Sequence, residues 1–420
     1  MVTLRLSFSP RIGIVWDPFK DGKTSIRSSF GLFDSLPFLW LYDTPLTRSL
    51  PIFVQGVTFS PTIGSFPSRA FGEMDLGSLR TAYVEREPSR AYSGKWALSV
   101  QRDVFGWLAE VGYSGSRGIH LPLVERNMNT VLPVETDAGW VYPEGAQVLN
   151  PNFASINTTD TWNADSYYHG LQASVRKSLS SGLQLLSSYT WSKSIDTASS
   201  AGSSQATAAY ESAVGVAHPL LPFLNRGLSD FDIRHNFVFS LVWELPFARS
   251  LTGVKRTVLD GWQLGSIYRG QTGTPISVSL NSDRAGSGAD TRGASLGQRP
   301  NLVVGPGCET LTNPGNPDGY VKTECFSFPA PRILGNLGRN RLTGPGLSNL
   351  DFSVFKNVNF TERLTSQIRV EFFNALNRTN FGDPAEVIYD NQGRITANAG
   401  RITSTSTDAR RIQVGLKLHF

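Results

Sequence analysis

The side chains best suited to covalent chemistry in this chain of 420 residues are its two cysteines, Cys308 and Cys325. Both lie in one segment rich in Gly, Pro and Asn. This placement favours a disulfide that closes an exposed loop in an oxidising compartment, and two free thiols in a reducing cytosol are the alternative. The cysteines therefore predict a structural cross-link.

Two further stretches carry part of a ligand-binding motif. Residues 17–24 end like a phosphate-binding loop, but Asp17 stands where the first Gly is required and a Pro follows it. Asn316 and Asp318 are spaced like the middle of a calcium loop, yet Cys325 occupies the position where an acidic ligand is needed. The five histidines are dispersed, without the close spacing of metal ligands. We therefore expect no metal, no cofactor and no enzyme activity, with calcium held by loop oxygens as the minor alternative.

The composition restricts the elements that could position any site. Charged residues make up 17% of the chain, against about 25% in an ordinary globular protein. There are 40 Gly and 24 Pro, and the mean hydropathy is −0.17. These values argue against a coiled coil, a helix-rich cytosolic enzyme and a helical membrane protein. The net charge of +5 comes from scattered Lys and Arg, so we expect no nucleic-acid partner.

Apolar and polar residues alternate along most of the chain. The last segment shows this most clearly, because apolar residues occupy every second position from 412 to 420. The same period of two recurs near residues 11–16, 24–33, 96–101, 107–113, 171–176, 183–193, 236–244, 261–280, 350–354 and 367–372. Such alternation predicts about 10 to 13 strands in an all-β, antiparallel fold.

Strand length and connection length separate a membrane barrel from a soluble sandwich. The alternation lasts for roughly ten residues at a time and often carries aromatics at its ends, which suits strands that cross a membrane. Short turns are expected near 103–106, 180–182 and 359–363, and long connections near 36–90, 115–165, 194–232, 281–346 and 377–409. Short turns on one side and long loops on the other are typical of outer-membrane barrels.

Several sequence motifs resemble a known family. The segments are Trp16-Asp17-Pro18-Phe19, Glu110-Val111-Gly112-Tyr113, Tyr189-Thr190-Trp191-Ser192-Lys193-Ser194, Asp232-Ile233-Arg234-His235-Asn236-Phe237, Gly270-Gln271-Thr272-Gly273-Thr274-Pro275 and Phe372-Phe373-Asn374-Ala375-Leu376-Asn377. In this order and spacing they are similar to the barrel of TonB-dependent outer-membrane receptors, with the Oar-like group as the best match. The resemblance covers nearly the whole chain.

The resemblance implies that the chain is the C-terminal part of a longer receptor. Barrels of this kind are expected to have about 22 strands, so residues 1–420 would supply roughly half, with the plug domain and the N-terminal strands absent. No secretory signal begins the sequence, which agrees with a missing N-terminal part. The implied location is the cell outer membrane of a Gram-negative-type bacterium.

The resemblance also implies a function and partners. The function is energised uptake of a ligand bound by extracellular loops and the barrel interior. The partners would be outer-membrane lipid, the barrel-assembly machinery, the remainder of the receptor and, through it, the TonB energy-transducing complex. The ligand could be a siderophore, a vitamin, a glycan or a peptide.

Three sets of residues are candidates for these roles. The barrel-insertion signal is expected in the last strand, at Val414, Leu416, Leu418 and Phe420. Polar alternation predicts contacts with the lumen or plug at Gln172, Arg176, Gln184, Glu244, Arg369, Glu371 and Lys417. Aromatics in the long connections are candidate ligand contacts, at Trp140, Tyr142, Trp162 and Tyr210.

Two other functions remain open on the sequence. One is a passive porin-like or adhesive outer-membrane barrel without energy coupling. The other is a soluble, secreted, β-rich carbohydrate-binding module, which would lack an outward apolar band about 25 Å tall.

Overall fold

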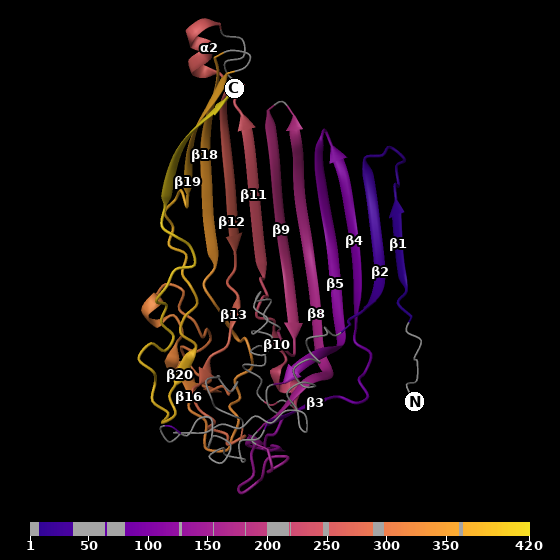
Figure 1. Ribbon diagram of the computed structural model, residues 1–420, viewed down its shortest axis with the longest axis vertical. Helices are drawn as coiled ribbons and strands as arrows, with labels where there is room; N and C mark the ends of the chain where they lie inside the picture. Colours follow the sequence, from indigo (N-terminus) through magenta and orange to yellow (C-terminus); the bar gives the residue numbers. More distant parts are fainter. Residues whose placement is uncertain are drawn as a thin grey trace.

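A computed structural model of the chain describes residues 8–36, 64, 80–125, 128–153, 155–180, 182–199, 218, 220–246, 252–288, 298–360 and 364–420. Its main feature is one sheet of 13 strands, as the sequence predicts. Eleven of these strands follow one another as β1-β2-β4-β5-β8-β9-β11-β12-β18-β19-β21, each antiparallel to the next. Figure 1 shows them side by side.

The strand bounds agree closely with the alternating segments of the sequence. They are β1 Arg11–Trp16, β2 Thr24–Asp34, β4 Tyr92–Val104, β5 Trp107–Glu125, β8 Ser155–Ser180, β9 Leu183–Asp196, β11 His235–Glu244, β12 Trp262–Gln271, β18 Leu347–Asn359, β19 Thr365–Phe373 and β21 Arg411–His419. Most contain nine residues or more, which is the length that a tilted strand needs to cross a bilayer.

The register gives the sheet two chemically different faces. Residues opposite one another in an antiparallel pair point to the same side. Val414 lies opposite Val370, which lies opposite Val354, whereas Gln413 lies opposite Glu371. We call the first side the apolar face and the second the polar face. The apolar face is largely exposed, with Ile12, Ile14, Trp16, Leu98, Val111, Trp191, Ile412, Val414, Leu416 and Leu418 each more than 40% accessible.

The two ends of the sheet differ in their connections (Figure 1). Short turns join β1 to β2, β4 to β5, β8 to β9 and β18 to β19, and the segment between β11 and β12 contains the helix α2, Gly253–Leu259. The opposite end carries the long connections, which we call the loop layer. No helix among the described residues has the length and apolar character needed to span a bilayer.

The loop layer is more ordered than the sequence suggested. It contains a core of buried residues around Val278, Leu280, Phe326 and Ile388. Short strands frame it: β13 Pro275–Ile276 with β17 Leu342–Thr343, β14 Ser279–Leu280 with β20 Val387–Tyr389, and β15 Asn301–Leu302 with β16 Phe326–Ser327. A disulfide joins Cys308 to Cys325, which lies fully buried in this core.

Two details differ from the expectation of one long loop at 115–165. β5 and β8 continue their pairing into this region, with irregular register after Gly118. β3, Arg80–Val84, then adds to the loop end of β8 in parallel, an arrangement that alternation alone does not predict. The connection between β5 and β8 also contains a small hairpin, β6 Val134–Thr136 with β7 Gly139–Val141.

Candidate functional site

The polar face contains every residue proposed from the sequence to line a lumen. The register places all seven on this one side: Gln172, Arg176, Gln184, Glu244, Arg369, Glu371 and Lys417. Gln172 lies opposite Thr190, and Arg176 lies opposite Leu186. The face is therefore predominantly polar and charged, with single apolar residues such as Leu186 and Phe355 among the polar ones. Whether these groups contact a ligand or a plug stays a prediction.

A cavity of about 740 Å³ opens where the polar face meets the loop layer. Asp351, Asp408 and Arg411 contribute its charges, and Arg411 forms an ion pair with Asp408 at 2.9 Å. Asp351 accepts hydrogen bonds from the Asn374 backbone N–H at 2.8 Å and from the Asn349 side chain at 3.0 Å. The buried Oδ1 atom of Asn349 has no hydrogen-bond partner among the described residues. The cavity can thus accept hydrogen bonds from a polar molecule.

The aromatic candidates occupy different environments. Trp140 is partly buried and packs against the Phe223 ring, with centroids 5.8 Å apart. Tyr142 is 1% exposed, and Trp162 lies buried within β8 and not in a loop. These two side chains are packing residues in this structure, which differs from the expected ligand-contact role. Tyr210 lies outside the described residues.

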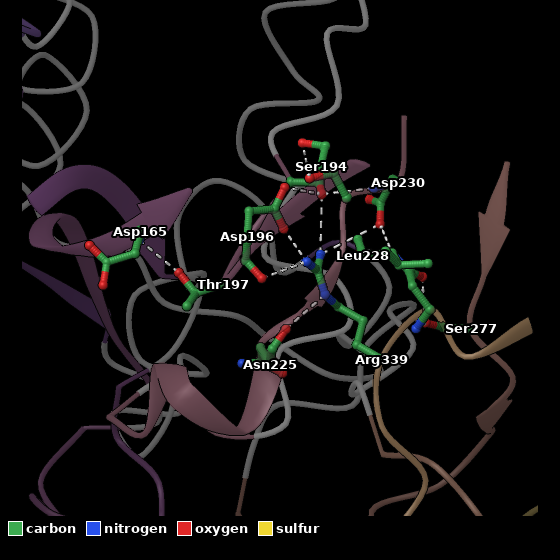
Figure 2. Close-up of polar contacts among 12 residues, drawn as sticks. Asp165, Ser194, Asp196, Thr197, Asn225, Leu228, Asp230, Ser277 and Arg339 are labelled. Atoms are coloured by element: carbon green, nitrogen blue, oxygen red, sulfur yellow. Dashed lines mark hydrogen bonds and ion pairs between the residues drawn. The ribbon is translucent and has the colours of Figure 1, made fainter. Parts of the chain in front are cut away.

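The Arg339 side chain bonds to several segments of the loop layer (Figure 2). Its side chain is 9% exposed and pairs with the 4%-exposed carboxylate of Asp196 at the end of β9. Nε donates to the backbone oxygen of Asn225 at 2.9 Å, and a terminal nitrogen donates to Ser199 Oγ at 3.3 Å. The same guanidinium also lies 3.5 Å from a carboxylate oxygen of Asp230. One guanidinium therefore links β9 to two separate segments of the layer.

Asn340 extends the same network to a further segment. Its amide nitrogen donates to the Leu228 carbonyl at 2.7 Å and to Asp230 Oδ1 at 2.6 Å. Its amide oxygen accepts a hydrogen bond from Ser277 Oγ at 2.7 Å. Figure 2 shows Asp230 beside Leu228 and Arg339. Because Arg339 and Asn340 both bond to Asp230, the network can fix the positions of the loop segments that it joins.

An arginine and a histidine side chain are also buried in the loop layer. Burial, together with repulsion from Arg339, lowers the pKa of Arg299 to about 10, so this side chain remains charged at neutral pH. Its Nε donates to the Leu337 carbonyl at 2.9 Å. Burial also lowers the pKa of His218, and a hydrogen bond to the Val131 carbonyl opposes this effect. These two side chains add a second buried cation, beside Arg339, and a neutral imidazole to the interior of the loop layer.

Sequence reasoning missed the Arg339 network because its members are far apart in the chain and have no fixed spacing. It also overlooked Gly293-Ala294-Ser295-Leu296-Gly297, which has the spacing of a nucleophile elbow. This segment lies outside the described residues, and the motif needs a strand-to-helix turn. Within the described part of the chain, no three His, Cys, Asp or Glu side chains converge to hold a metal ion.

A long antiparallel sheet with an exposed apolar face, a polar opposite face, short turns at one end and long loops at the other defines a membrane-spanning β-barrel protein. The sequence matches the family model described as "Outer membrane beta barrel domain" over residues 3–413. The chain belongs to this family and is located in the bacterial outer membrane. The predicted outer-membrane barrel is therefore confirmed, and a soluble secreted module is not.

Solved structures to which the chain is similar include two transporters and one receptor. The outer membrane transporter YddB from Escherichia coli is 9% identical, with a TM-score of 0.49 over 98% of this chain and 40% of that chain. The FrpB iron transporter from Neisseria meningitidis is 9% identical, with a TM-score of 0.41 over 97% and 38%. The ferripyoverdine receptor of Pseudomonas aeruginosa is 10% identical, with a TM-score of 0.44 over 97% and 32%.

This chain thus spans no more than about 40% of the length of these three structures. No curated protein sequence matches it.

Proposed function

We propose that this chain forms the C-terminal part of the barrel of a TonB-dependent outer-membrane receptor. In this function the loop layer and the polar face bind a ligand outside the cell. A plug and an inner-membrane energy-transducing complex then drive the ligand through the barrel. The sequence resemblance and the family of outer-membrane barrels both support the proposal.

The observation that carries the proposal is the direction of the two edge strands. β1 pairs only with β2, and β21 only with β19, among the described residues. Because the path contains eleven antiparallel strands, β1 and β21 run in the same direction. They cannot close on one another with the antiparallel pairing of outer-membrane barrels.

An open edge in lipid leaves unpaired backbone groups, each of which costs several kcal/mol. An odd number of further strands between β21 and β1 would remove both edges and restore antiparallel pairing. A 22-stranded barrel meets this condition, since it would need eleven more strands.

The polar face supports a ligand pathway in such a barrel. Charged residues are tolerated in a barrel lumen but are costly on the lipid side. The seven polar-face residues and the cavity beside Asp351 would then line the pathway or hold the plug. The loop layer lies at the entrance, where Arg339 and Asn340 fix its shape.

The test is to read the DNA upstream of the Met1 codon and to express the complete open reading frame in its native outer membrane. A plug domain followed by an odd number of additional strands is the expected result. Ligand uptake should then stop when the energy-transducing protein is deleted. A frame that encodes strands but no plug, with solute flux unaffected by that deletion, would instead establish a passive porin-like or adhesive barrel.

A further inference from the structure

The apolar face changes abruptly to a basic surface near the loop layer. Tyr113, Leu171 and Trp191 lie opposite one another across β5, β8 and β9. Two residues closer to the loops on the same face, His169 lies opposite Lys193, and both are exposed. The chemistry of this face therefore changes within one step of the strand alternation.

Two residues further toward the loops, two arginine side chains contact the ring of one tyrosine. Arg117 on β5 lies opposite Tyr167 on β8. The guanidinium of Arg117 is 5.0 Å from the Tyr167 ring centroid, and that of Arg226 is 4.8 Å from it. Both distances are within the range of cation–π attraction, which holds these two positive charges close together. We call Arg117, Tyr167, His169, Lys193 and Arg226 the basic rim.

The cations of the basic rim form no ion pair within the described part of the chain. No described carboxylate forms an ion pair with Arg117, Lys193 or Arg226. All three side chains are exposed. Three cations on neighbouring segments form a surface that attracts an anion.

Two tyrosine–histidine pairs with the same geometry lie on the apolar face beside the basic rim. Tyr113 Oη is 2.7 Å from His169 Nδ1, and Tyr189 Oη is 2.7 Å from His235 Nδ1. In both pairs the rings are 6.1 Å apart and inclined by 20°. Amphipathic rings gather where a barrel leaves the hydrocarbon region and enters the headgroups. The pairs thus mark the height of the membrane surface.

At the turn end of the sheet, the apolar face ends at a lysine that contacts a tryptophan ring. Lys177 Nζ lies 4.7 Å from the Trp107 ring centroid, near the turn end of β8. His169 and Tyr167 lie eight and ten residues from Lys177 on one strand, or about 26 Å and 33 Å at roughly 3.3 Å per residue. A strand tilt of about 40° reduces these lengths to about 20 Å and 25 Å along the membrane normal, close to the apolar band of about 25 Å in outer-membrane barrels. The basic rim and the turn-end lysine therefore lie near opposite edges of such a band.

We propose that the basic rim is a binding site for the phosphate-bearing headgroup of an outer-leaflet lipid. Arg and Lys form strong, charge-assisted hydrogen bonds with phosphate oxygens. The adjoining apolar row at Leu171 and Trp191 would contact the acyl chains of the same lipid. The site lies on the outside of the barrel, so it is distinct from the ligand pathway of the proposed function and does not depend on it.

The test compares lipid retention by the complete protein, purified in detergent, and two variants with three substitutions each. The rim variant carries Arg117→Gln, Lys193→Gln and Arg226→Gln. The control variant carries Lys20→Gln, Lys23→Gln and Lys255→Gln, which removes the same charge at the turn end. Each protein is mixed with a phosphorylated glycolipid or with its dephosphorylated form, and bound lipid is counted by native mass spectrometry.

We expect the rim variant to retain at least about tenfold less phosphorylated lipid than the unmodified protein, since each basic residue near a lipid surface contributes about 1 kcal/mol. The control should differ by less than about twofold, and dephosphorylated lipid should bind all three proteins alike. Equal retention by the rim and control variants would overturn the proposal. So would complete displacement of the lipid by millimolar inorganic phosphate, which would indicate a site for free anions.

Folding is checked by the heat-dependent gel mobility of each protein. If the rim variant does not fold, Lys193→Gln alone provides the second test. Its side chain is exposed, and a loss of roughly threefold to fivefold is expected from one charge. Unchanged retention in this folded variant would contradict the proposal.

Discussion

Arg339 and Asp196 form a buried ion pair between residues 143 positions apart in the chain. This contact ties the loop end of a membrane-spanning strand to the long connection between β12 and β18, close to the point where that connection reaches β17 and β18. Since a charge left without its partner in such a place is strongly destabilising, the pair is a sensitive point in the loop layer.

The first prediction concerns Arg339→Gln. The substitution should destabilise the local structure by about 3–5 kcal/mol, because Asp196 would stay buried without its partner. Hydrogen exchange should accelerate in residues 194–199 and 225–230. The matched control is Arg401→Gln, which breaks an exposed ion pair with Asp318 and should cost less than about 1 kcal/mol. Similar exchange in both variants would contradict the prediction.

The second prediction is a pH effect at His218. Its Nδ1 atom accepts a hydrogen bond from the Leu220 N–H at 3.2 Å, so the proton resides on Nε2, which faces the Val131 carbonyl at 3.0 Å. Protonation of Nδ1 would break the first bond and place a charge in a buried site. The lowered pKa means that the folded state binds fewer protons than the unfolded state.

Stability from the neutral ring is therefore complete above about pH 6.5, the pKa of an unperturbed histidine, and declines as the pH falls below it. Hydrogen exchange of residues 128–132, corrected for the intrinsic rate, should rise between pH 7.5 and pH 5. His218→Gln should abolish this change, whereas His120→Gln, at an exposed position, should preserve it. A change that persists in His218→Gln would refute the assignment.

The third prediction concerns the disulfide. Cys308 and Cys325 enclose a loop with a sequence separation of 17, and opening it should cost about 3 kcal/mol. Lys322 lies inside this loop, where its Nζ atom donates to the Gly307 carbonyl at 2.9 Å. Reduction should therefore accelerate tryptic cleavage after Lys322. A double variant, Cys308→Ser with Cys325→Ala, should be cleaved rapidly with or without reductant. Slow cleavage of the double variant would show that the cross-link does not protect this segment.

The fourth prediction tests the two faces of the sheet. Val111→Arg places a charge on the apolar face, and Gln172→Arg places one on the polar face of the neighbouring strand. The first should destabilise the inserted barrel by about 2–4 kcal/mol, the second by less than about 1 kcal/mol. The fraction of folded protein in lipid vesicles provides the measurement. Equal losses would mean that the two faces have similar surroundings.

The sequence predicted those parts of the fold in which local pattern and environment agree. Residues 11–16 and 24–33 became β1 and β2 almost without change, because their alternation reflects one apolar and one polar surface. Pairing of β5 with β8 beyond Gly118 was missed, since strands outside the apolar band have no reason to alternate. The Arg339 network was missed because its contacts depend on tertiary folding.

The candidate site was predicted unevenly for the same reason. Polar-face residues such as Gln172 and Arg369 could be grouped from their position in a strand, since period two determines the face. Tyr142 and Trp162 could not be placed, because an aromatic side chain in a connection can either pack inside or project outwards. Local sequence contains no signal that separates these outcomes.

The strand order also bears on how the chain tolerates rearrangement. The main path contains five antiparallel hairpins, and the long connections of the loop layer separate them. Four of the hairpins close with short turns, and the fifth, β11 with β12, closes with the segment that contains α2. A cut or an insertion in a long connection therefore leaves each hairpin whole, whereas one in a short turn divides a hairpin. Recombination and domain insertion can thus change the outer surface in units of two strands while the membrane-spanning register is preserved.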